Sequence, residues 1–219
     1  MKQIIVIGLG QFGMSLVKSL STRSVEVLAI DSKMELVNQA SEIMDEVLCL
    51  DATDESELEK IAPQKRDACI VAIGDESKES SIICTALLKQ LGAKKVISRA
   101  NDPIHERILY LVGANEVVNP ERDFGERFAN RIVYDNIIGE LPLGEDLLVS
   151  EIITPKELVG KSLKDLQLPR KYGITVVAIR NKRKKGVMIP KPDLALEEGS
   201  TLILVSPIDS AKKFMEKFG

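Results

Sequence analysis

The string GLGQFG at residues 8–13 follows the apolar run QIIVI at residues 3–7 and leads into a helical pattern. In such a strand, turn and helix, Gly8 makes the tight turn, Gly10 lets the backbone approach a pyrophosphate, and Gly13 permits close packing of helix on strand. The free amides at the helix start face the same phosphate. The string therefore predicts a nucleotide-binding loop made of Gly8, Gly10, Gln11, Phe12 and Gly13.

An acidic residue follows at the end of the second apolar run. Asp31 closes the string VLAID, eighteen residues beyond Gly13. A carboxylate at that position accepts both hydroxyls of an adenosine ribose and repels a 2′-phosphate, so an unphosphorylated ribose is favoured over NADP. Ser32 and Lys33 belong to the same expected site. The alternative is a sheet whose glycines serve packing alone.

Three further segments fall at the carboxyl edge of the predicted sheet, where open α/β folds bind ligands. Asp51, Ala52 and Thr53 follow the third strand, and Gly74 and Asp75 follow the fourth. Both loops are expected to line the adenosine side, although Thr53, Asp54 or Asp75 could instead cap the next helix. Arg99, at the end of the fifth strand, is either a phosphate partner or half of a surface ion pair.

Short apolar runs alternate with helical spacing over the first 118 residues. This alternation predicts a parallel sheet with right-handed crossovers, which is an α/β, Rossmann-like domain. Continuous apolar runs suit strands that are covered on both faces. The expected strands are residues 3–7, 26–30, 46–50, 68–73, 95–99 and 116–118, and the expected helices are residues 12–20, 33–40, 55–61, 76–91 and 103–112.

A change of pattern follows this domain. Residues 121–138 read as a helix whose apolar stripe, with Phe124, Phe128 and Ile132 spaced four apart, needs a partner surface. Glycine and proline then punctuate the chain near residue 140. We therefore expect a nucleotide-binding domain over 1–140, with a dimerising helix near 121–138, and a second domain over 145–219.

The second domain is expected to be a small mixed α/β module. Its strand candidates are residues 147–153, 174–179, 186–189 and 201–206, and its short helices lie near 162–166 and 209–218. A core of this size is marginal alone, so docking on another module or subunit would stabilise it.

Composition and charge exclude several classes of protein. Hydrophobic residues make up 44% and charged residues 29% of the chain, which is typical of globular rather than disordered proteins. The formal net charge of −3 argues against nucleic acid as a partner. Because the sequence has neither a membrane-spanning run nor a signal peptide, we expect a cytoplasmic protein.

The sequence also lacks the residues that a reaction would need. Cys49, Cys69 and Cys84 have no metal-binding spacing and read as buried reduced thiols. His105, the single histidine, has no obvious relay carboxylate and reads as a surface or interface residue. A nucleotide site without reaction machinery indicates a sensor that is not an enzyme. The alternatives are an NAD-dependent oxidoreductase with an unidentified small substrate and a redox-sensing transcription factor, although no helix-turn-helix segment supports the latter.

With these residues in hand, the sequence resembles the cytoplasmic regulatory proteins of Trk/Ktr-type potassium uptake systems, which consist of RCK N-terminal and C-terminal domains. The resemblance covers nearly the whole chain. It rests on VIGLGQFG at residues 6–13, LAID at 28–31, DATDESELEK at 51–60, VAIGD at 71–75, GANEVVNPERDFGERFA at 113–129, and LVGKSLKDLQLPRKYGITVVAIRN at 158–181.

The resemblance assigns roles to several residues. Gly8, Gly10, Gly13 and Asp31 match the family's phosphate and ribose positions, and residues 51–53 match its adenosine-side loop. Glu121 matches an acid that in some members lies near the terminal phosphate and a divalent cation. Gln11 stands where ATP-responsive members carry an arginine, so ATP, ADP, AMP and NAD(H) all remain candidate ligands.

The resemblance also implies partners and a second ligand. Such proteins pair through the helix after the last strand, and the dimers, of one chain or of two paralogues, form an eight-membered ring under a membrane potassium-transporter subunit. The protein would then be peripheral to the inner face of the membrane. Related C-terminal modules bind cyclic di-AMP at a dimer interface, and the corresponding strands and turn here carry Ile174, Ile179, Arg180, Asn181 and Pro190.

Overall fold

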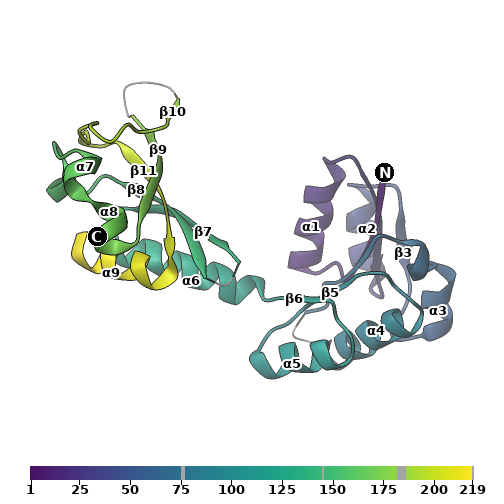
Figure 1. Cartoon of the computed structure of the whole chain (residues 1–219). Coiled ribbons are helices and arrows are strands. Elements are labelled where there is room, and N and C mark those ends of the chain that lie inside the picture. Colours follow the sequence, from purple (N-terminus) through teal and green to yellow (C-terminus); the bar gives the residue numbers. More distant parts are fainter. Residues whose placement is uncertain (75–76, 145, 182–185, 219) are drawn as a thin grey trace. The chain divides into compact units, whose positions relative to one another are not determined.

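The computed structural model describes residues 1–74, 77–144, 146–181 and 186–218. The chain forms two compact units, Met1–Glu121 and Arg122–Gly219, each with its own sheet and core (Figure 1). The division falls before the expected boundary near residue 140, because the segment after α6 pairs with the second sheet.

The first unit contains a six-stranded parallel sheet in the order β3-β2-β1-β4-β5-β6. This is the doubly wound order, in which the ligand crevice lies where the chain reverses direction, between β1 and β4. The predicted α/β class is confirmed. The strands are β1 (Lys2–Ile7), β2 (Val25–Asp31), β3 (Val47–Cys49), β4 (Ala68–Val71), β5 (Val96–Arg99) and β6 (Glu116–Val118).

Helices cover both faces of this sheet, which explains why its central strands are apolar throughout. In β1, Ile5 and Ile7 point into one core, and Val6 points into the other. Successive strand side chains face opposite sides, so both sets are buried. The helices are α1 (Gln11–Ser21), α2 (Met34–Ser41), α3 (Glu55–Lys60), α4 (Lys78–Gln90) and α5 (Pro103–Leu111), with a 3-10 turn η1 (Pro63–Lys65).

The second unit contains a five-stranded antiparallel sheet in the order β10-β9-β11-β8-β7. Its core joins the buried side chains of the sheet to those of the short helices and α9, including Phe214, which is fully buried. The expected mixed α/β module is confirmed. The elements are β7 (Ile137–Leu143), β8 (Leu147–Ile153), η3 (Lys156–Leu158), α7 (Leu163–Leu166), α8 (Leu168–Tyr172), β9 (Thr175–Arg180), β10 (Val187–Met188), β11 (Thr201–Pro207) and α9 (Ile208–Phe218).

The helix expected over 121–138 is shorter than the sequence suggested. Helix α6 covers Pro120–Val133, and Ile137 already belongs to β7. The Ile137 side chain is buried in the core of the second unit, so its apolar character reflects that core rather than the stripe of α6. The stripe itself keeps Phe124, Phe128 and Ile132, all of which are exposed.

Two single-residue expectations are wrong. Cys49 is exposed because β3 is a three-residue edge strand, whereas Cys69 and Cys84 are buried as expected. His105 is buried rather than at the surface. It lies four residues before Leu109 on α5, and residues with that spacing share one helix face.

Candidate functional site

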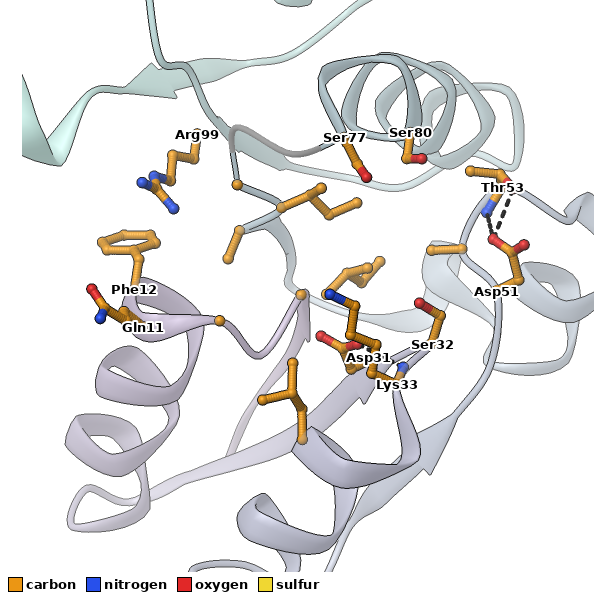
Figure 2. Close-up of a pocket in the computed structure, with 18 of the residues that line it drawn as sticks. Gln11, Phe12, Asp31, Ser32, Lys33, Asp51, Thr53, Ser77, Ser80 and Arg99 are labelled. Atoms are coloured by element: carbon orange, nitrogen blue, oxygen red, sulfur yellow. Dashed lines mark hydrogen bonds between the residues drawn. The ribbon is translucent and has the colours of Figure 1, made fainter.

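A pocket of about 500 Å³ lies at the carboxyl edge of the first sheet (Figure 2). Its volume is within the range of small-molecule sites. Figure 2 shows Phe12 and Arg99 at one end of the pocket and Asp51 and Thr53 at the other. The lining consists of Ile7, Gly8, Gly10, Gln11, Phe12, Asp31, Ser32, Lys33, Leu36, Leu50, Asp51, Ala52, Thr53, Ala72, Ile73, Gly74, Ser77, Ser80, Arg99 and Glu121.

The glycine loop follows β1 and enters α1, as its sequence predicts. Gly8 has a positive φ of 94°, and its N–H donates to the Ile30 carbonyl at 2.8 Å, which holds the turn against β2. Gly10 lies at the N-cap of α1, and a Cβ there would have nothing within 4 Å. The loop therefore presents an open approach to the first amides of the helix.

Gly13 has a different task, because it does not line the pocket. A Cβ at this position would lie 1.8 Å from the Gly8 carbonyl oxygen. The residue is buried inside α1, where it lets the helix pack directly on the turn. This is the packing role that the glycine pattern predicts.

Asp31 fastens the glycine loop to the second strand. Its Oδ2 accepts a hydrogen bond from the Leu9 N–H at 2.6 Å, and its Oδ1 accepts one from the Lys33 N–H at 2.8 Å. Each carboxylate oxygen has a second lone pair for another donor. The carboxylate that would meet a ribose therefore also fixes the position of the turn.

The loop after β3 has a defined internal structure. Asp51 Oδ1 accepts hydrogen bonds from the Thr53 N–H at 2.9 Å and the Thr53 hydroxyl at 2.7 Å, both drawn in Figure 2. The helix cap is Asp54, whose carboxylate accepts hydrogen bonds from the Ser56 hydroxyl and the Ser56 N–H. The hydroxyl bond first, and then the N–H bond, lowers the pKa of Asp54. Because Asp54 caps α3, Thr53 is left at the pocket wall.

Arg99 is the cation at the other end of the pocket. Its guanidinium carbon lies 5.6 Å from the Phe12 ring centroid, and Nη2 donates to Glu121 at 2.5 Å. The Arg99 side chain is only 13% exposed, whereas that of Glu121 is 59% exposed. The arginine is thus half of an ion pair and also part of the pocket wall, and its role as a phosphate partner stays a prediction.

The structure brings nearly all the expected nucleotide-site residues to one pocket. Asp75 lies outside the described residues, and Gly13 lies behind the loop. Sequence reasoning missed Ser77 and Ser80, which Figure 2 shows at the start of α4, facing the pocket. Their position directly after the fourth strand was the available signal. The apolar walls at Leu36, Leu50 and Ile73 were also missed.

The expected metal contact at Glu121 stays a prediction. Within the described ranges, no group of three or more His, Cys, Asp and Glu side chains is placed to hold a metal ion. The structure gives Glu121 an arginine partner instead.

A smaller pocket of about 270 Å³ lies in the second unit. It is lined by Leu163, Lys164, Leu168, Pro169, Thr175, Val176, Pro190 and Pro192. Of the residues expected to contact cyclic di-AMP, Pro190 lines it. Ile174 and Ile179 are buried in the core, and Arg180 pairs with Glu151 at 2.6 Å. Asn181 lies outside this lining and precedes residues that are not described.

Comparisons with known proteins agree with this architecture. A TrkA-N domain matches residues 4–120, and a TrkA-C domain matches residues 148–219. The chain is 36% identical over 216 residues to "Ktr system potassium uptake protein C" of Bacillus subtilis, covering 99% of this chain and 97% of that protein. It is 34% identical over 211 residues to "Ktr system potassium uptake protein A" of Vibrio alginolyticus, covering 95% and 94%.

Solved structures show the same fold. "GsuK channel bound to NAD" matches with a TM-score of 0.52 and 22% identity, over 100% of this chain and 38% of that one. The NAD(P)-binding domain of an exopolyphosphatase-related protein from Archaeoglobus fulgidus matches with a TM-score of 0.54 and 24% identity, over 61% and 98%.

Fold, pocket and matches define a regulatory protein built from a nucleotide-type Rossmann domain and a small C-terminal domain. The chain belongs to the Ktr potassium uptake regulatory proteins, with TrkA-N and TrkA-C (RCK) domains. These regulatory proteins are not enzymes. In the part of the chain that the structure describes, no helix has the length and apolar character to cross a bilayer.

Proposed function

We propose that this chain senses an adenine nucleotide and regulates a membrane potassium-transporter subunit through an oligomeric assembly. The observation that carries the proposal is the pocket itself, which joins the glycine loop, the Asp31 carboxylate and the Arg99 cation along one sheet edge. A ligand can shift the assembly only by binding one of its shapes more tightly than another. A tenfold preference supplies about 1.4 kcal/mol per site.

The pocket has distinct ends for a nucleoside and for phosphate. The carboxylate of Asp31 and the loop at residues 51–53 suit ribose and adenine, whereas the open Gly10 approach and Arg99 suit phosphate. An adenosine 5′-phosphate unit, as in ATP, ADP, AMP or NAD(H), matches this order. A 2′-phosphate would meet the charge of Asp31, so NADP(H) is disfavoured.

The test is to identify and then titrate the ligand. Mass spectrometry of the native oligomer is expected to show an adenine nucleotide, and calorimetry is expected to rank ATP, ADP, AMP, NAD+ and NADH. Asp31→Asn should weaken each of them at least about tenfold, because a neutral amide is a poorer ribose acceptor. Glu26→Ala, an acid of the same strand outside the pocket lining, is the matched control. No affinity for any of these ligands would overturn the proposal.

The oligomer is proposed to form through α6. Phe124, Phe128 and Ile132 are 61%, 40% and 64% exposed, and the two phenylalanine rings stack with centroids 5.7 Å apart. Water-exposed apolar side chains in one stripe suit a helix that meets its symmetry mate. Dimers of this kind would be the units of the expected eight-membered ring beneath the membrane subunit.

The second pocket supports cyclic di-AMP as a candidate ligand of the C-terminal domain. Its apolar lining at Leu168, Val176 and Pro190 suits a base, and Lys164 at the rim suits a phosphate. Titration of the full chain with cyclic di-AMP should give heat that is reduced in Lys164→Ala. An absence of heat would remove this ligand.

A further inference from the structure

Arg99 joins three parts of the pocket that are far apart in the sequence. It ends β5, its guanidinium lies over the Phe12 ring of α1, and Nη2 holds Glu121 in the first turn of α6. A Cβ on Gly74, in the loop after β4, would lie 3.5 Å from Nη1. One mostly buried cation therefore contacts the glycine-loop helix and α6 and lies beside the β4 loop.

Arg99 has more hydrogen-bond donors than its ion pair with Glu121 uses. A guanidinium carries five N–H donors on three nitrogens. Within the described residues, Nη2 donates to Glu121 and Nε is buried away from the pocket surface, which leaves Nη1 as the nitrogen for a ligand. Figure 2 shows the guanidinium beside the Phe12 ring, at one end of the pocket that Arg99 lines. Because Glu121 leaves the Nη1 donors unused, this part of the pocket is suited to an acceptor-rich ligand group.

The exposure of the two side chains decides whether Glu121 helps or hinders a phosphate there. The Glu121 side chain is 59% exposed, so water and salt screen its repulsion of a second anion. The Arg99 side chain is 13% exposed, and its ion pair restricts the rotation of a long, flexible side chain. We therefore expect the orienting effect on Arg99 to outweigh the repulsion between Glu121 and a phosphate.

We propose that Glu121 is a positioning residue for phosphorylated ligands, because it holds Arg99 with the Nη1 donors available to the phosphate. The same contact ties the first turn of α6 to the occupied pocket. This inference rests on the proposed function, since it requires a phosphorylated nucleotide in the pocket. By linkage, the phosphate strengthens the Arg99–Glu121 contact as much as that contact strengthens phosphate binding.

The experiment compares ADP with adenosine, which lacks phosphate, by calorimetry on the full chain. Glu121→Ala should weaken ADP about tenfold and leave adenosine unchanged. In an Arg99→Ala background, Glu121→Ala should have no further effect on ADP, because the residue it positions is gone. Arg99→Lys is the variant to use if Arg99→Ala does not fold, and it too should shrink the effect of Glu121→Ala.

Hydrogen exchange provides a readout in the helix itself. ADP should slow exchange of the amides at residues 121–126 in the wild type and not in the Arg99 variants, while adenosine should leave them unchanged. The matched control is Glu116→Ala, which breaks the exposed Lys95–Glu116 ion pair of the same unit outside the pocket lining and should change neither measurement.

The outcomes separate this inference from the proposed function. If Glu121→Ala weakens ADP equally with and without Arg99, or only when a divalent cation is present, Glu121 acts on the ligand without the arginine and the inference is overturned. Unchanged ADP affinity in Glu121→Ala overturns it as well. If the wild type binds neither ADP nor adenosine, the proposed function itself fails.

Discussion

Gly10 and Gly13 are three residues apart, yet a methyl group would meet opposite surroundings at the two positions. Gly10 has φ −62°, which any residue adopts, and open space around it on the pocket side. Gly10→Ala should therefore change the free energy of unfolding by no more than about 1 kcal/mol. The affinity of the Gly10→Ala variant for adenine nucleotides should fall by on the order of tenfold or more, because the methyl group occupies the space through which a phosphate would approach the loop.

Gly13→Ala should instead destabilise the folded protein. The methyl carbon would overlap the Gly8 carbonyl oxygen, which is backbone and cannot rotate away. We expect a loss of about 4 kcal/mol or more, or no folded protein. Urea unfolding of both variants, with calorimetry of Gly10→Ala, checks the pair. Equal stability of the two variants would show that α1 does not pack on the turn as described.

The three cysteines should differ sharply in reactivity. Burial raises the pKa of the Cys69 thiol to about 12 and that of Cys84 higher still, so neither forms the reactive thiolate near neutral pH. Cys49 is exposed on the edge strand β3. A thiol reagent at about pH 8 should therefore label one cysteine in the native protein and all three after unfolding. Cys49→Ser should abolish the native reaction, and rapid native labelling of two thiols would contradict this assignment.

At the residue scale, the sequence predicted those pocket residues whose position depends only on the local chain, within one strand, turn and helix. The glycine loop and Asp31 follow from spacing along one strand, turn and helix. The joint role of Arg99 was not predictable, because its partners Phe12 and Glu121 come from α1 and α6, and only the folded sheet brings them together. His105 was misjudged for the related reason that its burial depends on which face of α5 meets the sheet.

Among the elements, β7 shows where local patterns stop being informative. Its Gly139 and Pro142 read as turn residues, yet β7 is an edge strand with a register shift between Ile137 and Gly139. Proline and glycine are tolerated at edges and bulges because one side of the strand has no ladder to maintain. The central strands β1, β2 and β4 were predictable because burial on both faces makes them continuously apolar.

Helix α6 allows a test of how the protein forms dimers. Within its described residues no side chain is buried, although it presents Phe124, Phe128 and Ile132 on one stripe. If this stripe is the dimer contact, Phe128→Asp buries a charge in it. The dimer should then dissociate, so that the smallest species in solution has half the mass of the wild-type dimer. Light scattering measures that mass.

The control for this variant lies on the same unit. Ile189→Asp changes a side chain that is 86% exposed in the β10 region, away from α6, and should leave the mass unchanged. If Phe128→Asp keeps the wild-type mass, α6 is not the dimer helix.

The hydrophobic clusters of the described residues divide between the two units: those on the two faces of the parallel sheet belong to the first unit, and another fills the second unit. The nucleotide pocket is lined by residues of Met1–Glu121 alone. A ligand that binds only the folded form stabilises it by RT ln(1 + [L]/Kd), which is about 2.7 kcal/mol at a hundredfold excess over Kd. For a unit of this size the melting temperature should rise by on the order of 10 °C.

Calorimetric scans should therefore show two unfolding transitions, of which a saturating adenine nucleotide raises one. Asp31→Asn should remove most of that shift, while the other transition stays at its wild-type temperature in every sample. Limited proteolysis during the scan assigns each transition, because cleavage after the first one leaves the fragment of the more stable unit. If the scan shows a single transition that rises as a whole, the two cores unfold as one cooperative body, and the nucleotide stabilises the second unit through that shared unfolding.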